Sequence, residues 1–381
     1  VLAATVPDSN RDGPPVPRLR PAGWREILLA LLLGLFAHGA AAGDSSRDAD
    51  WRHAPYVLGQ GLSFPQRQLT LGGYLSLRYL DLDDVDSSLG IKDLSLFIGW
   101  EPGDRWNVFA EIEIGDALSI SRHGIDTADA EIEIERLYVD YRARPYANLR
   151  AGKFLTPVGR WNLIHADPLV WTVSRPLTTA VSFARQASGA MLYGTIPAGA
   201  GGIDYSLFVD DTETLDPGQQ EERAFEDANP AIPTLGAFRH ATGARLAYHS
   251  LDERFSLGMS SAHFRMEDLR EPKDLIGVDL FWDTPFAELS GEWLRRDSGG
   301  GEPGERGGFA QAVIPLPARL FLIGRYERYR TSVQPATATI RTLGLTYRPH
   351  RAVSVKLEYR GGDRNELVSP GGWLGSLAIL F

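Results

Sequence analysis

Charged side chains recur at every second position in parts of this chain, and that spacing indicates which chemistry the sequence can offer. Glu111 and Glu113 alternate with isoleucines, and Glu131, Glu133 and Glu135 do the same in the next such segment. Alternate residues of a β-strand point to opposite faces, so each set lines one face. Basic residues take the same kind of position elsewhere: Arg142, Arg150, Lys153, Arg245, Arg325, Lys356 and Arg360. Facing walls of opposite charge would attract or repel ions rather than cleave bonds.

Catalytic chemistry finds little support in the residue patterns. A hydrolase needs a nucleophile or an activated water beside a histidine and a carboxylate, but the nucleophile motif Gly-x-Ser-x-Gly is absent. Asp126 and Asp167 are close in sequence to His123 and His165, whereas other histidines are scattered. Cysteine is absent and no two histidines have the spacing of a zinc motif. We expect no catalytic residue, cofactor or metal, and keep an outer-membrane hydrolase as the weakest alternative.

The elements that would position these charges are alternating apolar and polar segments separated by turn-rich stretches. About sixteen of them, most of roughly ten residues, can be recognised. They cover residues 69–79, 94–100, 106–114, 131–141, 147–155, 187–196, 202–210, 241–249, 254–264, 274–283, 286–296, 307–315, 319–329, 338–348, 352–361 and 372–381. The alternation slips near Arg136, which predicts a β-bulge.

Strand length and aromatic placement favour strands that cross a membrane. Soluble strands usually have about five or six residues, and tyrosine and tryptophan recur near the ends of these longer ones. The final segment places Trp373, Leu377, Ile379 and Phe381 on one face. A soluble sandwich ending in an ordinary edge strand is the alternative. Closure of the last strand onto residues 69–79 would remove both exposed edges of the sheet.

Export is predicted by the N-terminal region. Arginines precede an apolar run, Ile27–Ala37, and Ala40 and Ala42 provide small residues for cleavage. The run is too short for a permanent membrane helix, and a buried helix is the alternative. We expect residues 1–43 to be an upstream segment plus signal peptide, 44–67 a short N-terminal segment, and 68–381 a barrel. The remainder after residue 43 has 35 basic and 46 acidic residues, which gives no basis for binding nucleic acid.

The connections between the predicted strands alternate in length. Short ones, such as 101–104, 284–285 and 349–351, suit periplasmic turns, and long ones, such as 115–130, 211–239 and 297–306, suit outer loops. The long connection 156–186 differs because it is rich in apolar residues, including Trp161 and Trp171, which need burial. We expect it to fold into the barrel and narrow it; packing over the rim or at a subunit contact is the alternative.

One segment carries a resemblance to a known family. Residues 149–162, with the sequence LRAGKFLTPVGRWN, resemble a motif of the phosphate-selective porin O/P family, in which a strand leads through Pro-x-Gly into a long inward loop. That resemblance implies a sixteen-stranded trimeric channel whose arginines and lysines line the route of an anion. The chain departs from the pattern because it is acidic and has only four lysines, so phosphate selectivity is not supported.

The sequence therefore predicts an all-β, transmembrane antiparallel barrel in the outer membrane of a Gram-negative bacterium. We expect passive diffusion of small hydrophilic solutes or ions, with anions such as phosphate among the candidates; a non-conducting adhesin or structural barrel is the alternative. Expected partners are membrane lipids, the solutes, two further copies in a homotrimer and the barrel-assembly machinery, which would read Phe381. The candidate constriction and selectivity residues are Arg150, Lys153, Arg160, Asp167, Arg175, Arg185, Glu111, Glu113 and Glu133.

Overall fold

A computed structural model describes the chain over most of its predicted barrel. The described residues are 55–83, 85–127, 130–164, 166–180, 182–216, 236–267, 271–299, 304–331, 337–366 and 368–381. They belong to one compact unit, Ser46–Phe381. The expected signal peptide and the first residues of the expected 44–67 segment lie outside the described residues, so both remain predictions.

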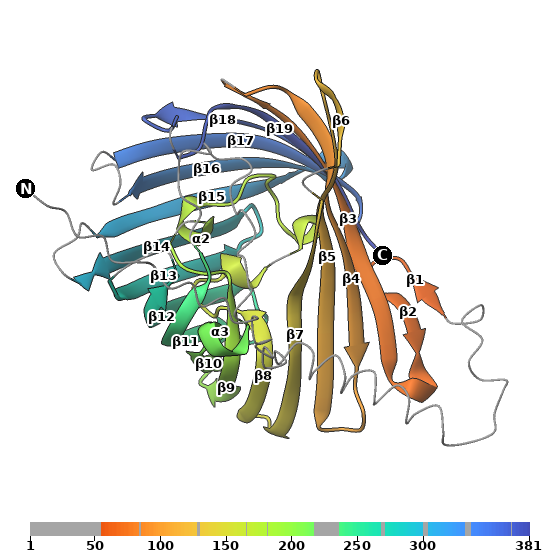
Figure 1. Ribbon diagram of the computed structural model, residues 1–381, viewed down its shortest axis with the longest axis vertical. Coiled ribbons are helices and arrows are strands. Elements are labelled where there is room, and N and C mark those ends of the chain that lie inside the picture. Colours follow the sequence, from red (N-terminus) through yellow and green to blue (C-terminus); the bar gives the residue numbers. More distant parts are fainter. Residues whose placement is uncertain are drawn as a thin grey trace, which may run out of the picture. The chain divides into compact units, whose positions relative to one another are not determined.

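Sixteen long antiparallel strands form a closed barrel (Figure 1), as the alternation predicted. The strands are β3 (Leu69–Leu82), β4 (Ser88–Trp100), β5 (Trp106–Ser121), β7 (Glu131–Arg144), β8 (Ala147–Leu155), β9 (Gln186–Ala198), β10 (Gly201–Asp210), β11 (Phe238–Ser250), β12 (Phe255–Met266), β13 (Lys273–Asp283), β14 (Glu288–Ser298), β15 (Glu305–Leu316), β16 (Leu320–Arg330), β17 (Thr337–His350), β18 (Val353–Asp363) and β19 (Gly372–Leu380). Short strands β1 (Tyr56–Val57), β2 (Gly61–Phe64) and β6 (Gly124–Asp126) extend the same sheet.

The barrel closes where the last strand meets the first. β19 pairs with β3 from Gly372 opposite Leu82 to Leu380 opposite Tyr74. Phe381 continues the ladder, because its N–H donates to the Gly73 carbonyl and the Gly73 N–H donates to the Phe381 carbonyl, both at 2.8 Å. A Cβ added at Gly73 would lie 3.0 Å from the Phe381 ring and 2.1 Å from the Ser95 carbonyl oxygen. Glycine at this position therefore admits both the neighbouring strand and the terminal ring.

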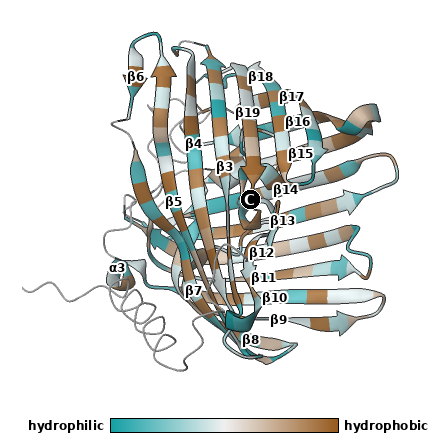
Figure 2. Ribbon diagram, turned by 90° about the vertical axis from the view of Figure 1, so that its right-hand side faces the viewer, coloured by the Kyte–Doolittle hydropathy of each residue, from teal (hydrophilic) through white to brown (hydrophobic). Residues whose placement is uncertain are grey.

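The outward face of the barrel is apolar, as lipid contact requires. Along β12 and β13 the outward residues Leu257, Met259, Ile276 and Val278 are about half exposed, and apolar and polar positions alternate along the strands (Figure 2). Exposed aromatic residues lie toward both ends of the strands: Trp106, Trp282 and Tyr347 at one end and Tyr79, Tyr359 and Trp373 at the other. This arrangement matches the two aromatic girdles of membrane barrels.

Short connections gather at one end of the barrel and long connections at the other, as expected. Residues 145–146 and 199–200 are examples of the short set, and 156–185 and 211–237 of the long set. The predicted loop 115–130 is shorter than expected because β5 continues to Ser121. Its register with β4 shifts between Ile91 and Asp93, which interrupts the alternation there. The bulge expected near Arg136 is confirmed by a register shift at Glu111 and Ile112 on the partner strand.

The interior is filled in part by the connection between β8 and β9, residues 156–185, which we call the inner loop. It contains short helical turns at Trp161–Leu163 and Asp167–Leu169 and the helix α2 (Leu177–Ala180). Its Val158 and Phe183 join the main buried apolar cluster with Phe208, Phe264 and Leu294 of the wall. A second short helix, α3 (Thr212–Leu215), follows β10.

In the part of the chain that the structure describes, no helix is long and apolar enough to cross a membrane.

Candidate functional site in the barrel lumen

The inner loop leaves the wall at β8, enters the lumen and returns at β9 (Figure 1). Its two ends are tied together, because the Thr156 N–H donates to the Arg185 carbonyl at 2.8 Å. The Asn162 side-chain amide donates to the carbonyls of both residues, at 2.8 and 3.1 Å. Because Asn162 is buried, it fixes the base of the loop from inside. The two ends of the loop are therefore held together, and the loop extends from them toward strands that are distant in the sequence.

Carboxylates on the facing wall accept backbone N–H groups of the inner loop. Glu292 of β14 accepts from Arg160 and Trp161 at 2.7 and 2.6 Å. Glu358 of β18 accepts from two further loop residues at 2.9 and 3.0 Å, and Glu327 of β16 accepts from Leu177 at 2.9 Å. An irregular segment has no sheet partner for these donors, and a buried N–H without a partner is costly. The wall carboxylates thus accept the hydrogen bonds that a neighbouring strand would accept in a sheet.

Cations on the same wall donate to the loop carbonyls, which completes the pattern. Arg325 of β16 donates to Thr172 and to both oxygens of Ser174, at 2.6–3.0 Å. Arg348 of β17 donates to two successive carbonyls at 3.2 Å, and Arg296 of β14 donates to one near α2 at 3.1 Å. Because charged groups make the stronger hydrogen bonds, these contacts hold the loop in one place across the lumen.

Asp167 bonds to both strands of the closing seam. Its Oδ2 accepts from Ser76 Oγ of β3 at 2.7 Å and from Ser376 Oγ of β19 at 2.8 Å. Its Oδ1 accepts from Lys356 Nζ of β18 at 2.9 Å, and the same amine donates to the Asp167 carbonyl at 2.6 Å. Burial alone would raise the pKa of Asp167, but Lys356 and Lys92 outweigh it and hold that pKa below its usual range. Asp167 is therefore a charged anchor.

The acidic residues predicted to line one face of two strands lie together on β5 and β7, with Asp93 of β4 beside Glu113. Glu113 accepts hydrogen bonds from Tyr74 at 2.7 Å and from Ser95, and Glu111 accepts from Arg136. Glu133 binds Lys153 Nζ at 2.8 Å. The prediction that acidic and basic residues form separate, facing walls is therefore wrong in part, because acids and bases pair with each other on neighbouring strands. The physical reason is that a charge taken out of bulk water needs a partner close by.

The inner loop brings two of the predicted arginines to this acidic cluster. Arg175 lies within electrostatic reach of Arg185, Tyr74, Asp93 and Glu135. Arg185 acts on Glu111 and Glu133 in turn. Burial lowers the pKa of Arg175 to about 10, and Arg185 acts in the same direction. Arg175 therefore stays cationic at neutral pH, and both loop arginines lie within electrostatic reach of wall carboxylates.

Arg150 lies apart from the loop arginines and from Asp167. It makes a bidentate ion pair with Asp140, with nitrogen–oxygen distances of 2.7 and 3.0 Å. Its guanidinium lies 3.7 Å from the ring centroid of Tyr138 and 5.3 Å from that of Tyr193. Such stacking and pairing fix the arginine against the wall. Apart from Arg160, the predicted residues thus divide into the loop–acid cluster, the Asp167 anchor and this separate wall site.

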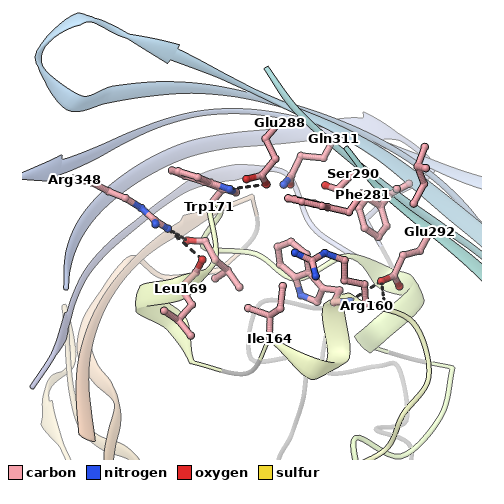
Figure 3. A pocket seen from close by; sticks show the side chains of 15 residues that line it. Arg160, Ile164, Leu169, Trp171, Phe281, Glu288, Ser290, Glu292, Gln311 and Arg348 are labelled. Carbon is pink, nitrogen blue, oxygen red and sulfur yellow. Dashed lines mark hydrogen bonds between the residues drawn. The ribbon is translucent and has the colours of Figure 1, made fainter. Parts of the chain in front are cut away.

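Arg160 lies in a pocket between the inner loop and strands β13, β14, β15 and β17 (Figure 3). The pocket has a volume of about 220 Å³. The Arg160 guanidinium lies 4.0 Å from the centroid of the Phe281 ring, and that of Arg348 lies 3.9 Å from the Trp171 ring. Trp171 Nε1 donates to Glu288 at 2.8 Å. The pocket combines aromatic faces with charges of both signs.

The anchors Glu292, Glu327 and Glu358 were missed as functional candidates. Their signal in the sequence is an acidic residue at an inward position of a strand, such as Glu358 between Lys356 and Arg360. That pattern is equally typical of any polar lumen, so it does not say that these carboxylates hold a loop.

Comparisons with known proteins agree with this fold. No family model matches the chain. It is 23% identical over 343 residues to an uncharacterized protein of Aquifex aeolicus (strain VF5), covering 77% of this chain and 76% of the relative. The anion-selective porin from Comamonas acidovorans is similar in structure, with a TM-score of 0.55, 16% identity, and coverage of 82% of this chain and 98% of the porin. The trimer form of OmpT, an outer membrane protein of Vibrio cholerae, has a TM-score of 0.52, 10% identity, and coverage of 82% and 99%. The barrel thus has the fold of outer-membrane porins.

Proposed function

We propose that the chain is a porin of the Gram-negative outer membrane, through which small hydrophilic solutes or ions diffuse passively. The observation that carries this proposal is the closed barrel whose inner loop crosses the lumen and is bonded to the opposite wall. A loop held in this way sets the width of a water path without any chemistry. The apolar outer face, with aromatic residues toward both strand ends, supports a membrane setting.

We infer that charge selection occurs where Arg175 and Arg185 face the carboxylates of β5 and β7. Selection there is weak, because acids and bases lie close together and their fields partly cancel. Phosphate selectivity receives no support from the lysines. Lys153 and Lys356 are bonded to carboxylates and Lys273 to Ser298, so these three do not form a row of available amines.

Recording from purified protein in a planar lipid bilayer tests the proposal. We expect stepwise conductance and a small reversal potential in a salt gradient. Silence at high protein concentration would refute the porin proposal and favour a non-conducting structural barrel. A large reversal potential of either sign would refute weak selection while leaving passive diffusion intact.

Three further parts of the proposal concern maturation and assembly. We propose that a signal peptide within residues 1–43 is removed, that the barrel-assembly machinery reads Phe381, and that three copies associate in the membrane. The trimer form of OmpT and the family resemblance support the last point. Mass measurement of the protein extracted in mild detergent tests the number of copies, and N-terminal sequencing tests the cleavage.

A further inference from the structure

We propose that the pocket beside Arg160 binds a small zwitterion of the α-amino acid class with an apolar side chain. This inference rests on the proposed porin function and names a solute class for it. The pocket is formed where the loop residues Arg160 and Trp161 meet Glu288 and Gln311 of the wall (Figure 3).

The pocket contains opposite charges that do not form an ion pair with each other. No carboxylate oxygen of a described residue lies within 4.0 Å of the Arg160 guanidinium, although Glu288 is the carboxylate with the strongest electrostatic effect on it. Stacking on Phe281 holds the guanidinium in place. A ligand carboxylate beside Arg160 and a ligand ammonium beside Glu288 would give each of these charges a partner. A zwitterion carries both groups.

Unpartnered polar atoms support a ligand of this kind. Gln311 lines the pocket with only 3% of its surface exposed, and its Oε1 has no hydrogen-bond partner within the described residues. The Nε1 atom of Trp161 is likewise buried without a partner there. An unpaired buried polar atom is unfavourable. The Gln311 oxygen can accept from an ammonium, and the indole N–H can donate to a carboxylate.

Size and apolar surface limit the solute further. Trp161, Val170 and Phe309 form a buried cluster with Ile164 packed against it, and all four line the pocket. A volume of about 220 Å³ corresponds to about seven water molecules at roughly 30 Å³ each. That space suits an amino acid of the size of leucine, whose side chain would contact the apolar cluster.

Calorimetric titration of the detergent-solubilised barrel tests the proposal with three matched probes. The probes are L-leucine, 4-methylpentanoate, which lacks the ammonium group, and isoamylamine, which lacks the carboxylate. We expect leucine to bind about tenfold more tightly than either partial analogue, because each lost charged hydrogen bond weakens binding. Equal or tighter binding of one analogue, or of the uncharged polyol myo-inositol, would overturn the proposal.

Two variants assign the two ends of the ligand. Arg160→Gln keeps the backbone N–H that Glu292 accepts, and Glu288→Gln keeps an oxygen for Trp171 Nε1. We expect Arg160→Gln to remove the preference for leucine over isoamylamine, and Glu288→Gln to remove its preference over 4-methylpentanoate. Arg254→Gln, in an exposed turn between β11 and β12, is the matched control and should bind leucine normally. Unchanged preferences in both pocket variants would overturn the proposal.

Bilayer recording on the same preparations separates this inference from the porin proposal. Conductance without leucine binding would overturn the pocket and leave the porin proposal standing. Leucine binding with the expected preferences, but without conductance, would support the pocket and refute the porin proposal.

Discussion

Releasing the Asp167 anchor should free the inner loop, and we develop this prediction first. In Asp167→Ala the ion pair with Lys356 Nζ and the hydrogen bonds from Ser76 and Ser376 are lost together. The Lys356 amine keeps its bond to the backbone carbonyl of residue 167. The substitution therefore leaves a buried cation with part of its partners.

The magnitude follows from these contacts. Removing one partner of a buried ion pair costs about 3–5 kcal/mol. Because Lys356 keeps its hydrogen bond to the backbone carbonyl, we expect docking of the loop to be weakened by about 3 kcal/mol, the lower end of this range. Since 1.4 kcal/mol corresponds to about a factor of ten, the loop should detach about a hundredfold more often. Ser376→Ala removes a single hydrogen bond to a charged carboxylate, worth about 1.5 kcal/mol, so it should increase detachment only about tenfold.

Thiol labelling measures the detachment directly. The chain has no cysteine, so Ala166→Cys introduces a single thiol beside the anchor, at a position that is 4% exposed. We expect the rate of labelling by a membrane-impermeant thiol reagent to rise in the order of the unaltered anchor, Ser376→Ala and Asp167→Ala. Heat-modifiable migration in gels should show that each barrel is still folded.

An unchanged labelling rate in a folded Asp167→Ala barrel would refute the reasoning. It would mean that the remaining anchors, such as Glu292 and Glu358, hold the loop regardless of this ion pair. An equal increase in Ser376→Ala and Asp167→Ala would also contradict it, because the charge would then contribute nothing beyond one hydroxyl contact.

Three further predictions concern selectivity, pH and assembly. Arg175→Glu changes the local charge by two, and at about 7 Å in water each unit is worth about 0.6 kcal/mol. Cation permeability should therefore rise about sevenfold and anion permeability should fall about as much, so their ratio should rise about fiftyfold, and Arg160→Glu should act in the same direction. An unchanged reversal potential in both variants would show that neither arginine lies along the ion path. Because the pKa of Asp167 is lowered, its stabilisation is present above the usual value of about 3.9 and is lost only as pH falls through the lowered value. The ratio of the labelling rates of Asp167→Ala and the unaltered anchor should therefore stay constant between about pH 8 and pH 5, and a loss of that difference in that range would contradict a charged anchor. Deleting Phe381 removes the pair of hydrogen bonds with Gly73 and should reduce the folded barrel in the membrane while secretion continues; normal amounts of heat-modifiable barrel would count against the role of this residue.

The strands were predictable because one face of each must meet lipid and the other the lumen. β18 was expected at 352–361 and covers Val353–Asp363. β4 was expected only from Leu94, but begins at Ser88. The difference arises at Lys92 and Asp93, where the register shifts and the alternation fails. Periodicity therefore identifies strands well and loses their ends wherever a bulge intervenes.

The inner loop was predictable as a buried segment, but its contacts were not. Its tryptophans and prolines indicate burial, whereas nothing in the sequence pairs Asp167 with Ser376, 209 residues away. Which strand faces the loop depends on the number of strands around the barrel and on the path of the loop across the lumen. Such contacts depend on closure of the whole ring, and local spacing contains no information about it.

The position of Asp167 has a consequence for the order in which the barrel forms. β3 and β19 are the first and last long strands of the sheet, so pairing them closes a very long segment of chain, which is slow because so much conformational freedom is lost at once. Asp167 lies between them in the sequence and bonds a serine of each. A loop already docked on β3 would offer the arriving β19 a prepared partner. The inner loop would then first guide the pairing of β3 with β19 that closes the barrel, and only afterwards narrow the lumen.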